Sequence, residues 1–377
     1  MTILDRYLLF LFLRTFLVCF LSFTGLYIVI HLFSNLDELS ALSKESSWGE
    51  LMVAFYGPRV AEMFGKTAPV LALVAGIFSI SMLQRNRELT AIEAGGITKL
   101  RALRSIIFAG LVIVALTVAN RELLIPKFKD RLVRTPQNWH DRGKVPMSPR
   151  EDLRTGMKFR GKEFFVGDKR ITEANVQLPL AVSTSLPRIA ADSATLIPAS
   201  EVHPEGMLFD GVTLPPVMTS TDSILFDQQP LVFSPKDFPW LEADQCFVAV
   251  KMDADQIAFG KKLAQYRPTS EMMAALKQPK RQFGQSEEVS VHARLLRPVL
   301  DIALLLLGLP MIVSNSERNI FVSAGLGFLI VGSVFLVDAA CQGLGAYRLL
   351  EPAALAAWLP LIIFVPLAVL SMRKLKA

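Results

Sequence analysis

The sequence predicts an α-helical membrane protein with six transmembrane helices, three on each side of an inserted all-β domain of jellyroll type. Three observations lead to this fold class. Hydrophobic residues make up 52% of the 377 residues and charged residues only 20%, which is too apolar for an ordinary soluble domain. The apolar residues gather in blocks of about 20, the length that crosses a bilayer as a helix. One long polar stretch separates the first three blocks from the last three.

The first three predicted spans cover residues 7–33, 60–83 and 103–118. Arg14 interrupts the first, where its long side chain can reach the headgroups. The second span begins unusually, because Arg59, Glu62 and Lys66 lie in its first two turns. Glu62 and Lys66 are four residues apart and can therefore form an ion pair on one helix face.

Residues 120–290 form the predicted β-domain, which separates a membrane part of residues 1–119 from a second one of residues 291–377. Short apolar alternations between turn residues predict strands, in a sandwich or jellyroll rather than an α/β domain. The segments are 158–167, 194–202, 206–214, 223–233 and 246–252. A helix is predicted over 263–276, capped by Thr269 or Ser270.

The last three spans are predicted over residues 295–313, 320–341 and 353–370. They contain Pro298, Pro310 and Pro360, which membrane helices tolerate when neighbouring groups satisfy the freed backbone. Arg297 and Asp301 are four residues apart and predict a helix-anchoring ion pair. Asp338 lies near the outer end of the fifth span.

Basic residues predict the orientation, because short cytoplasmic loops are rich in Lys and Arg. With six spans, the basic clusters fall on one side, which places both termini in the cytoplasm and the long polar domain outside. These residues are Arg6, Arg14, Arg85, Arg87, Lys99, Arg101, Arg104, Arg318, Arg373, Lys374 and Lys376. The same rule accounts for the net charge of +6 without nucleic acid as a partner.

Residues 86–96 predict a short amphipathic helix between the second and third spans. Asn86 is a suitable N-cap, Glu88 lies in the first turn, and Gly95-Gly96 ends the helix. Leu89, Ile92 and Glu93 are three or four residues apart and share one face. The helix either transmits movement from a partner into the membrane or is a solvated loop on the headgroups.

We find no motif in the sequence for catalysis, cofactor binding or metal binding. Gly65-Lys66-Thr67 resembles the end of a phosphate-binding loop, but Val60 stands where a glycine is required, so we expect no ATPase activity of its own. The four histidines lack metal-ligand spacing, and the three cysteines, Cys19, Cys246 and Cys341, are too widely separated to indicate a disulfide framework or a zinc site. We expect neither metal nor cofactor.

Four segments in the right order resemble a known family. ELTAIEAGGI (residues 88–97) resembles the cytoplasmic coupling helix of the lipopolysaccharide-export permeases, the LptF/LptG family. DRYLLFLFLRTF opens the chain as family members do, and RLLRP (residues 294–298) resembles the start of their fourth span. ERNIFVSAGLGFLI (residues 317–330) resembles the start of their fifth span.

The resemblance implies a permease subunit in the bacterial inner membrane that pairs with a paralogous permease subunit as a heterodimer. A separate cytoplasmic ABC ATPase would drive it to extract lipopolysaccharide. The periplasmic jellyroll would pass the lipid to periplasmic bridge proteins, and the first and fifth spans would form the lateral gate. Glu88 would be the polar anchor for the ATPase, and Leu89 and Ile92 the apolar knobs. The full coupling set is Glu88, Leu89, Ala91, Ile92, Glu93, Gly95 and Gly96.

The lipid headgroup contacts depart from the family pattern. At the outer end of the first span, His31, Asp37 and Glu38 occupy the region where a cluster of lysines can hold phosphate groups. Lys66 and Arg59 of the second span are the predicted substitutes. For Lys66, neutralisation by Glu62 or extension of its side chain toward the headgroups is the alternative.

Three other functions stay open at this point. The alternatives are a permease for a different glycolipid, a membrane-anchored periplasmic binding or sensor protein, and a membrane-embedded lipid-modifying enzyme. Six spans exceed what an anchor requires, and convergent catalytic side chains at the span ends are not found in the sequence. Which half of a heterodimer the chain forms also stays open.

Overall fold

The structure is a computed structural model, and two compact units make up the chain. The helical unit contains Met1–Leu36, Ser46–Phe128 and Arg267–Ala377, and the β-unit contains Asp37–Glu45 and Lys129–Tyr266. The residues that the structure describes are 2–43, 47–139, 144–147, 149–152, 155–179, 182–183, 186–226, 229–252, 254–276, 285–313, 320–347, 349–350 and 352–373.

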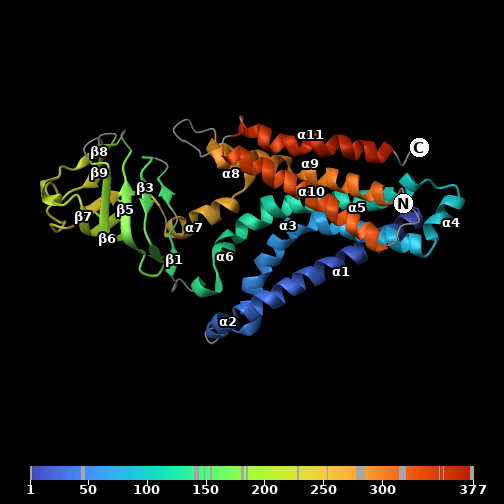
Figure 1. The fold of residues 1–377 in the computed structure, drawn as a ribbon. Coiled ribbons are helices and arrows are strands. Elements are labelled where there is room, and N and C mark those ends of the chain that lie inside the picture. Colours follow the sequence, from blue (N-terminus) through green and yellow to red (C-terminus); the bar gives the residue numbers. More distant parts are fainter. Residues whose placement is uncertain are drawn as a thin grey trace. The chain divides into compact units, whose positions relative to one another are not determined.

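Six long helices form the helical unit (Figure 1). They are α1 (Ile3–Ser34), α3 (Trp48–Arg85), α5 (Lys99–Ala119), α9 (Gln285–Val313), α10 (Ile320–Ala346) and α11 (Ala353–Arg373). Two shorter helices accompany them, α4 (Glu88–Ala94) and α8 (Thr269–Leu276). The π-helix η1 (Asn120–Leu124) and the 3₁₀-helix η2 (Ile125–Phe128) continue α5.

Five described helical segments are long and apolar enough to cross a membrane: Ile3–Ser34, Trp48–Arg85, Lys99–Val133, Gly325–Ala346 and Ala353–Arg373. They correspond to the first, second, third, fifth and sixth predicted spans. Helix α9 has 29 residues, enough length for a bilayer at about 1.5 Å per residue. Its role as the remaining span stays a prediction.

One apolar core holds the bundle together. Helix α1 contributes Leu8, Phe12 and Phe16, which are four residues apart and therefore line one face. Close packing of α3 and α9 depends on glycine: a Cβ added at Gly308 would lie 2.5 Å from a methyl group of Leu73. The glycine therefore admits the neighbouring helix where any larger residue would collide.

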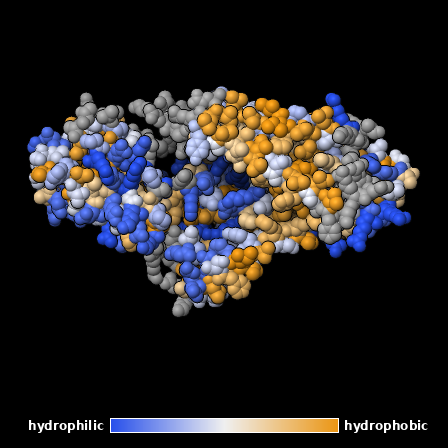
Figure 2. All heavy atoms as spheres, in the orientation of Figure 1, coloured by the Kyte–Doolittle hydropathy of each residue, from blue (hydrophilic) through white to orange (hydrophobic). Residues whose placement is uncertain are grey.

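Outward-facing side chains of the bundle are also apolar, as expected of helices solvated by lipid. Figure 2 shows hydrophobic side chains gathered over the visible face of the helical unit and mainly hydrophilic ones over the β-unit. Such a continuous exposed apolar surface would be an aggregation hazard in water. Examples of exposed large apolar residues are Leu17, Leu21 and Leu26 on α1 and Ile362 and Leu370 on α11.

A ten-stranded antiparallel sheet dominates the β-unit. The strands are β1 (Lys144–Pro146), β2 (Arg150–Glu151), β3 (Lys158–Arg160), β4 (Glu163–Phe165), β5 (Arg170–Gln177), β6 (Arg188–Ile197), β7 (Gly206–Leu214), β8 (Ile224–Phe226), β9 (Gln229–Phe233) and β10 (Cys246–Ala249). Their order is β1-β4-β5-β6-β7-β10-β9-β8, and β3 pairs with both β2 and β5. Each predicted segment overlaps a strand, although 194–202 covers only the end of β6, and β1, β2 and β5 were not predicted. The jellyroll arrangement stays a prediction.

The β-unit has its own apolar core, which includes Phe159, Phe164, Phe209 and Phe247. All four residues of β10 are buried, because β10 lies between β7 and β9. Three short helices complete the unit: α2, whose bounds are Leu36–Ser43, α6 (Lys129–Val133) and α7 (Ala254–Gln265).

The prediction of one helix over 263–276 is wrong, because two helices share these residues. Leu263 belongs to α7, which ends at Gln265, and α8 begins separately at Thr269. Pro268 explains the break, because a proline disfavours helical backbone in the residue before it. The start of α8 is held by Glu122, whose carboxylate accepts from the Thr269 N–H at 2.7 Å and from its hydroxyl at 2.6 Å.

Candidate functional site

Helix α4 is the candidate coupling element, and it lies at the same end of the bundle as the start of α1 and the end of α11 (Figure 1). The predicted stop is confirmed, since Gly95 is the C-cap and Gly96 follows with φ +78°. The predicted N-cap is wrong. Arg87, in a left-handed conformation with φ 58°, is the N-cap, and Asn86 instead ends α3.

The shared face of Leu89, Ile92 and Glu93 is turned toward the chain's own bundle. Leu89 is only 4% exposed and belongs to the bundle core, and Ile92 packs against the same core. In this structure Leu89 anchors α4 to the bundle, and its role as an apolar knob for a partner stays a prediction. Glu93 lies beside Lys99, whose Nζ is 3.6 Å from Glu93 Oε1.

Small and polar residues form the outer face of α4. Thr90, Ala91 and Ala94 are exposed, together with Arg87 before the helix and Gly95 after it. The side chains of Thr90, Ala91 and Ala94 are short, which permits close approach of another surface to the helix. Ala91 and Gly95 are thus the members of the predicted coupling set that the fold leaves accessible along with Gly96.

The Glu88 carboxylate is held by two donors at the edge of this face. The Tyr7 hydroxyl of α1 donates to Glu88 Oε2 at 2.8 Å, and the Asn86 Nδ2 donates to Oε1 at 3.2 Å. Sequence reasoning did not identify Tyr7, because local periodicity carries no signal between residues so far apart in the chain.

Next to this contact, Asp5 fixes the start of α1 on α5. Asp5 is buried and closes a capping box with Thr2. Its Oδ2 lies 3.1 Å from Arg101 Nη2, and its Oδ1 accepts from the Ser105 hydroxyl at 2.9 Å. Arg101, expected to mark the cytoplasmic side, thus also has a structural ion pair.

The two predicted lipid-contact residues differ in accessibility. The Lys66 side chain is 67% exposed, and its Nζ lies 2.6 Å from Glu62 Oε1, which confirms the predicted ion pair. Arg59 is only 8% exposed. Its guanidinium lies over the Phe55 ring at 3.4 Å and donates to the Phe55 carbonyl oxygen at 2.7 Å. In this structure the Arg59 guanidinium is therefore not accessible to a lipid headgroup.

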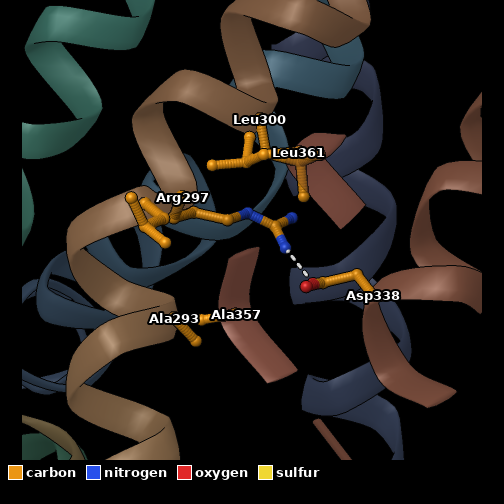
Figure 3. Close-up of a pocket in the computed structure, with 7 residues that line it drawn as sticks. Ala293, Arg297, Leu300, Asp338, Ala357 and Leu361 are labelled. Atoms are coloured by element: carbon orange, nitrogen blue, oxygen red, sulfur yellow. Dashed lines mark hydrogen bonds and ion pairs between the residues drawn. The ribbon is translucent and has the colours of Figure 1, made fainter. Parts of the chain in front are cut away.

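A buried ionic cluster joins α9 to α10. The predicted pair is confirmed, with Arg297 Nε 3.2 Å from Asp301 Oδ1. A second carboxylate was not predicted: Arg297 Nη1 donates to Asp338 Oδ2 at 2.8 Å, and Gln342 donates to Asp338 Oδ1 at 2.9 Å. Figure 3 shows Arg297 and Asp338 pointing toward one another beside Leu361. The adjoining cavity of about 10 Å³ has room for about one water and none for a lipid group.

A larger cleft of about 220 Å³ lies beside the cluster. It is lined by three arginines, Arg121, Arg294 and Arg297. Arg121 also contacts Glu122, and Arg297 contacts Asp301 and Asp338, so carboxylates already offset part of the positive charge. Arg121 Nη2 donates to the Arg294 carbonyl oxygen at 3.1 Å, and Arg294 Nη1 donates to the Arg267 carbonyl oxygen at 2.9 Å. The sequence predicted Arg297 as part of a helix-anchoring ion pair with Asp301 and did not indicate this cleft.

Metal-ligating groups do not gather in threes among the described residues. His31 Nδ1 is 3.1 Å from the Tyr56 hydroxyl, and His203 Nδ1 is 2.9 Å from the Pro204 carbonyl oxygen. His140 lies outside the described residues.

Long apolar helices, a small helix between two of them and an inserted antiparallel β-domain are the features of a polytopic membrane protein. The sequence profile of the family described as "Lipopolysaccharide export system permease LptF/LptG" matches residues 6–374. The chain therefore belongs to this family, whose members are permease components of the bacterial inner membrane. None of the curated protein sequences matches it.

Proposed function

We propose that the chain is the permease subunit of an ATP-driven exporter that extracts lipopolysaccharide from the inner membrane and passes it to a periplasmic bridge. Helix α4 is the observation that carries the proposal, because its inner face is fixed to the bundle while its outer face is free of bulky side chains. A separate cytoplasmic ABC ATPase docks on this outer face, with Glu88 as the polar contact.

Charge at the α4 end of the bundle supports a cytoplasmic position for α4. Basic residues near the start of α1, on both sides of α4 and at the end of α11 share this end (Figure 1), as the positive-inside rule requires. The described ones are Arg6, Arg85, Arg87, Lys99, Arg101, Arg104 and Arg373, whereas Arg318, Lys374 and Lys376 lie outside the described residues. The β-unit is then periplasmic, and both termini are cytoplasmic.

Energetics explain why such a permease requires an ATPase. Each CH₂ group of an acyl chain that leaves the hydrocarbon costs about 0.8 kcal/mol, and lipopolysaccharide carries several chains. A binding site strong enough to offset this cost alone would retain the lipid. An apolar cavity between this chain and a paralogous permease, closed by nucleotide-driven movement, lowers the cost and releases the cargo.

Headgroup contacts are proposed at two places on the helical unit. Lys66 is exposed and keeps donors available beside its contact with Glu62. The cleft lined by Arg121, Arg294 and Arg297 offers guanidinium groups, for which a phosphate would compete with the carboxylates of Glu122, Asp301 and Asp338. Arg59 is only 8% exposed, so Lys66 is the more accessible of the two predicted residues.

Co-purification from native membranes tests the proposal. The tagged full chain should retain an ABC ATPase, a second permease and lipopolysaccharide, identified by mass spectrometry. Glu88→Lys should remove the ATPase, and Glu50→Lys, a charge reversal at an exposed position near the start of α3, should retain it. Retention of the ATPase by Glu88→Lys would contradict the docking site. A different glycolipid in the wild-type preparation would replace lipopolysaccharide as the cargo.

A further inference from the structure

The hydrogen bond between Tyr7 and Glu88 connects the proposed docking helix to the first span directly. Tyr7 lies two residues after Asp5 near the start of α1, and its hydroxyl donates to Glu88 Oε2 at 2.8 Å. Asn86 donates to the other carboxylate oxygen at 3.2 Å. Both oxygens are thereby oriented, and a carboxylate oxygen can accept a further hydrogen bond from a partner.

Different interactions hold the inner face of α4, called its base here, and its first residue Glu88, which lies at its edge. Leu89 and Ile92 hold the base through apolar packing against the bundle. Glu88 sits at the edge, and its orientation depends on the polar contacts of Tyr7 and Asn86. Loss of the Tyr7 hydroxyl would therefore release the edge of α4 while leaving its base in place.

Helix α1 is the span best able to respond to movement of α4. Only 11% of its apolar stretch is buried, against 61% for α3. Loose packing lowers the free energy needed to move an element. Its first half is nevertheless held to the bundle, by the contacts of Asp5 with Arg101 and Ser105 of α5 and by the buried Leu8 and Phe12. Helix α1 thus has a first half held to the bundle and, within it, a contact with the docking helix at Tyr7.

We infer that Tyr7 is a positioning residue, which orients Glu88 for the ATPase and carries displacement of α4 to α1. The inference rests on the proposed function, since it concerns how the docking site is connected to the transport path. Loss of a hydrogen bond to a charged group, after allowance for its exposure, should shift the equilibrium between the closed and the locally opened state of α4 by about 3- to 10-fold.

Hydrogen exchange on the full-length chain in lipid nanodiscs tests the contact without any partner. In Tyr7→Phe, amides of α4 should exchange about 3- to 10-fold faster than in the wild type, with the rest of the bundle unchanged. Tyr27→Phe removes a hydroxyl from the same helix and should leave α4 unchanged. Equal exchange of α4 in Tyr7→Phe and the wild type would overturn the inference.

The coupling role is tested in the complete complex reconstituted in proteoliposomes. Tyr7→Phe should keep the ATPase bound but lower the lipopolysaccharide released per ATP hydrolysed by about 3-fold or more. A merely structural role would instead lower thermal stability and reduce hydrolysis and release together, and that result would overturn the inference. A wild-type chain that binds no ATPase would defeat the proposed function, whereas the exchange comparison would still decide the Tyr7 contact.

Discussion

The helical unit buries more of its charged groups than the β-unit does. Among the described residues, the helical unit buries Asp5, Arg59, Asp301 and Asp338, and the β-unit buries one charged residue, Asp152. Lipid explains the difference. A charge on the outside of a membrane helix faces hydrocarbon and is costly there, so such groups turn inward and pair. In water, the outside is the favourable place for a charge.

Two ion pairs of nearly equal length show what this difference means. Arg297 and Asp338 in the helical unit are 2.8 Å apart, and Lys162 and Glu173 in the β-unit are 2.9 Å apart. The Asp338 side chain is only 12% exposed, whereas Lys162 and Glu173 are each more than 60% exposed. Distance alone therefore does not measure the contribution of an ion pair, and burial decides how much its loss costs.

The largest effect is expected when Arg297 is removed. Arg297→Met leaves the Asp301 and Asp338 carboxylates buried without their cation, which should lower the free energy of unfolding by about 3 kcal/mol. Titration with SDS in mixed micelles measures it. The triple variant Arg297→Met/Asp301→Asn/Asp338→Asn, which removes the charges together, should recover most of the loss. A triple variant as unstable as the single one would show that packing, not charge, is responsible.

Overpacking between α3 and α9 should have the next largest effect. Gly308→Val introduces atoms where a Cβ already comes within 2.5 Å of Leu73, a fully buried side chain. The free energy of unfolding should fall by about 1–3 kcal/mol in the same titration. Gly332→Val on α10 is the matched control, because a Cβ there meets no described atom within 4 Å. Equal losses in both variants would contradict the close packing.

A smaller effect is expected from Cys246 in the core of the β-unit. Burial raises the pKa of its thiol from 9.0 to about 12. The unfolded thiol ionises first, so this contribution is complete below pH 9 and is lost as the pH rises toward 12. Between pH 9 and 10 the wild type should lose about 1 kcal/mol more stability than Cys246→Ala, measured by urea unfolding of the β-unit in the full chain. Parallel pH profiles would contradict the burial of the thiol.

The smallest effect is expected from the exposed ion pair of Lys162 and Glu173. Lys162→Gln removes the contact with Glu173, and the thermal unfolding midpoint of the full chain should remain the same within error, because water solvates both partners. A clear fall in the midpoint would remove the distinction between the two units that burial predicts.

Hydropathy and local spacing predicted the long helices and the short helix between two of them. They also predicted the pairs Glu62–Lys66 and Arg297–Asp301, because partners four residues apart are visible in the sequence. Strand β5 escaped prediction, since its sequence RITEANVQ lacks the clear apolar alternation of its neighbours.

Most features that the sequence did not predict depend on contacts between residues that are far apart in the chain. The Tyr7–Glu88 bond, the Asp5–Arg101 pair and the place of Asp338 depend on how distant helices pack, and periodicity contains no such information. The same holds for Leu89: spacing showed which residues share its face, but not that this face turns toward the bundle. Which surfaces are accessible to a partner therefore required the structure.

Photocrosslinking from the outer face of α4 in living cells tests the central claim most directly. A photoreactive amino acid at Ala91 should crosslink to a cytoplasmic ABC ATPase, while the same group at Val53, exposed near the start of α3, should not. Crosslinking from Val53 and none from Ala91, or labelling of Ala91→Cys by a membrane-impermeant reagent added outside, would contradict a permease driven through α4 from the cytoplasm.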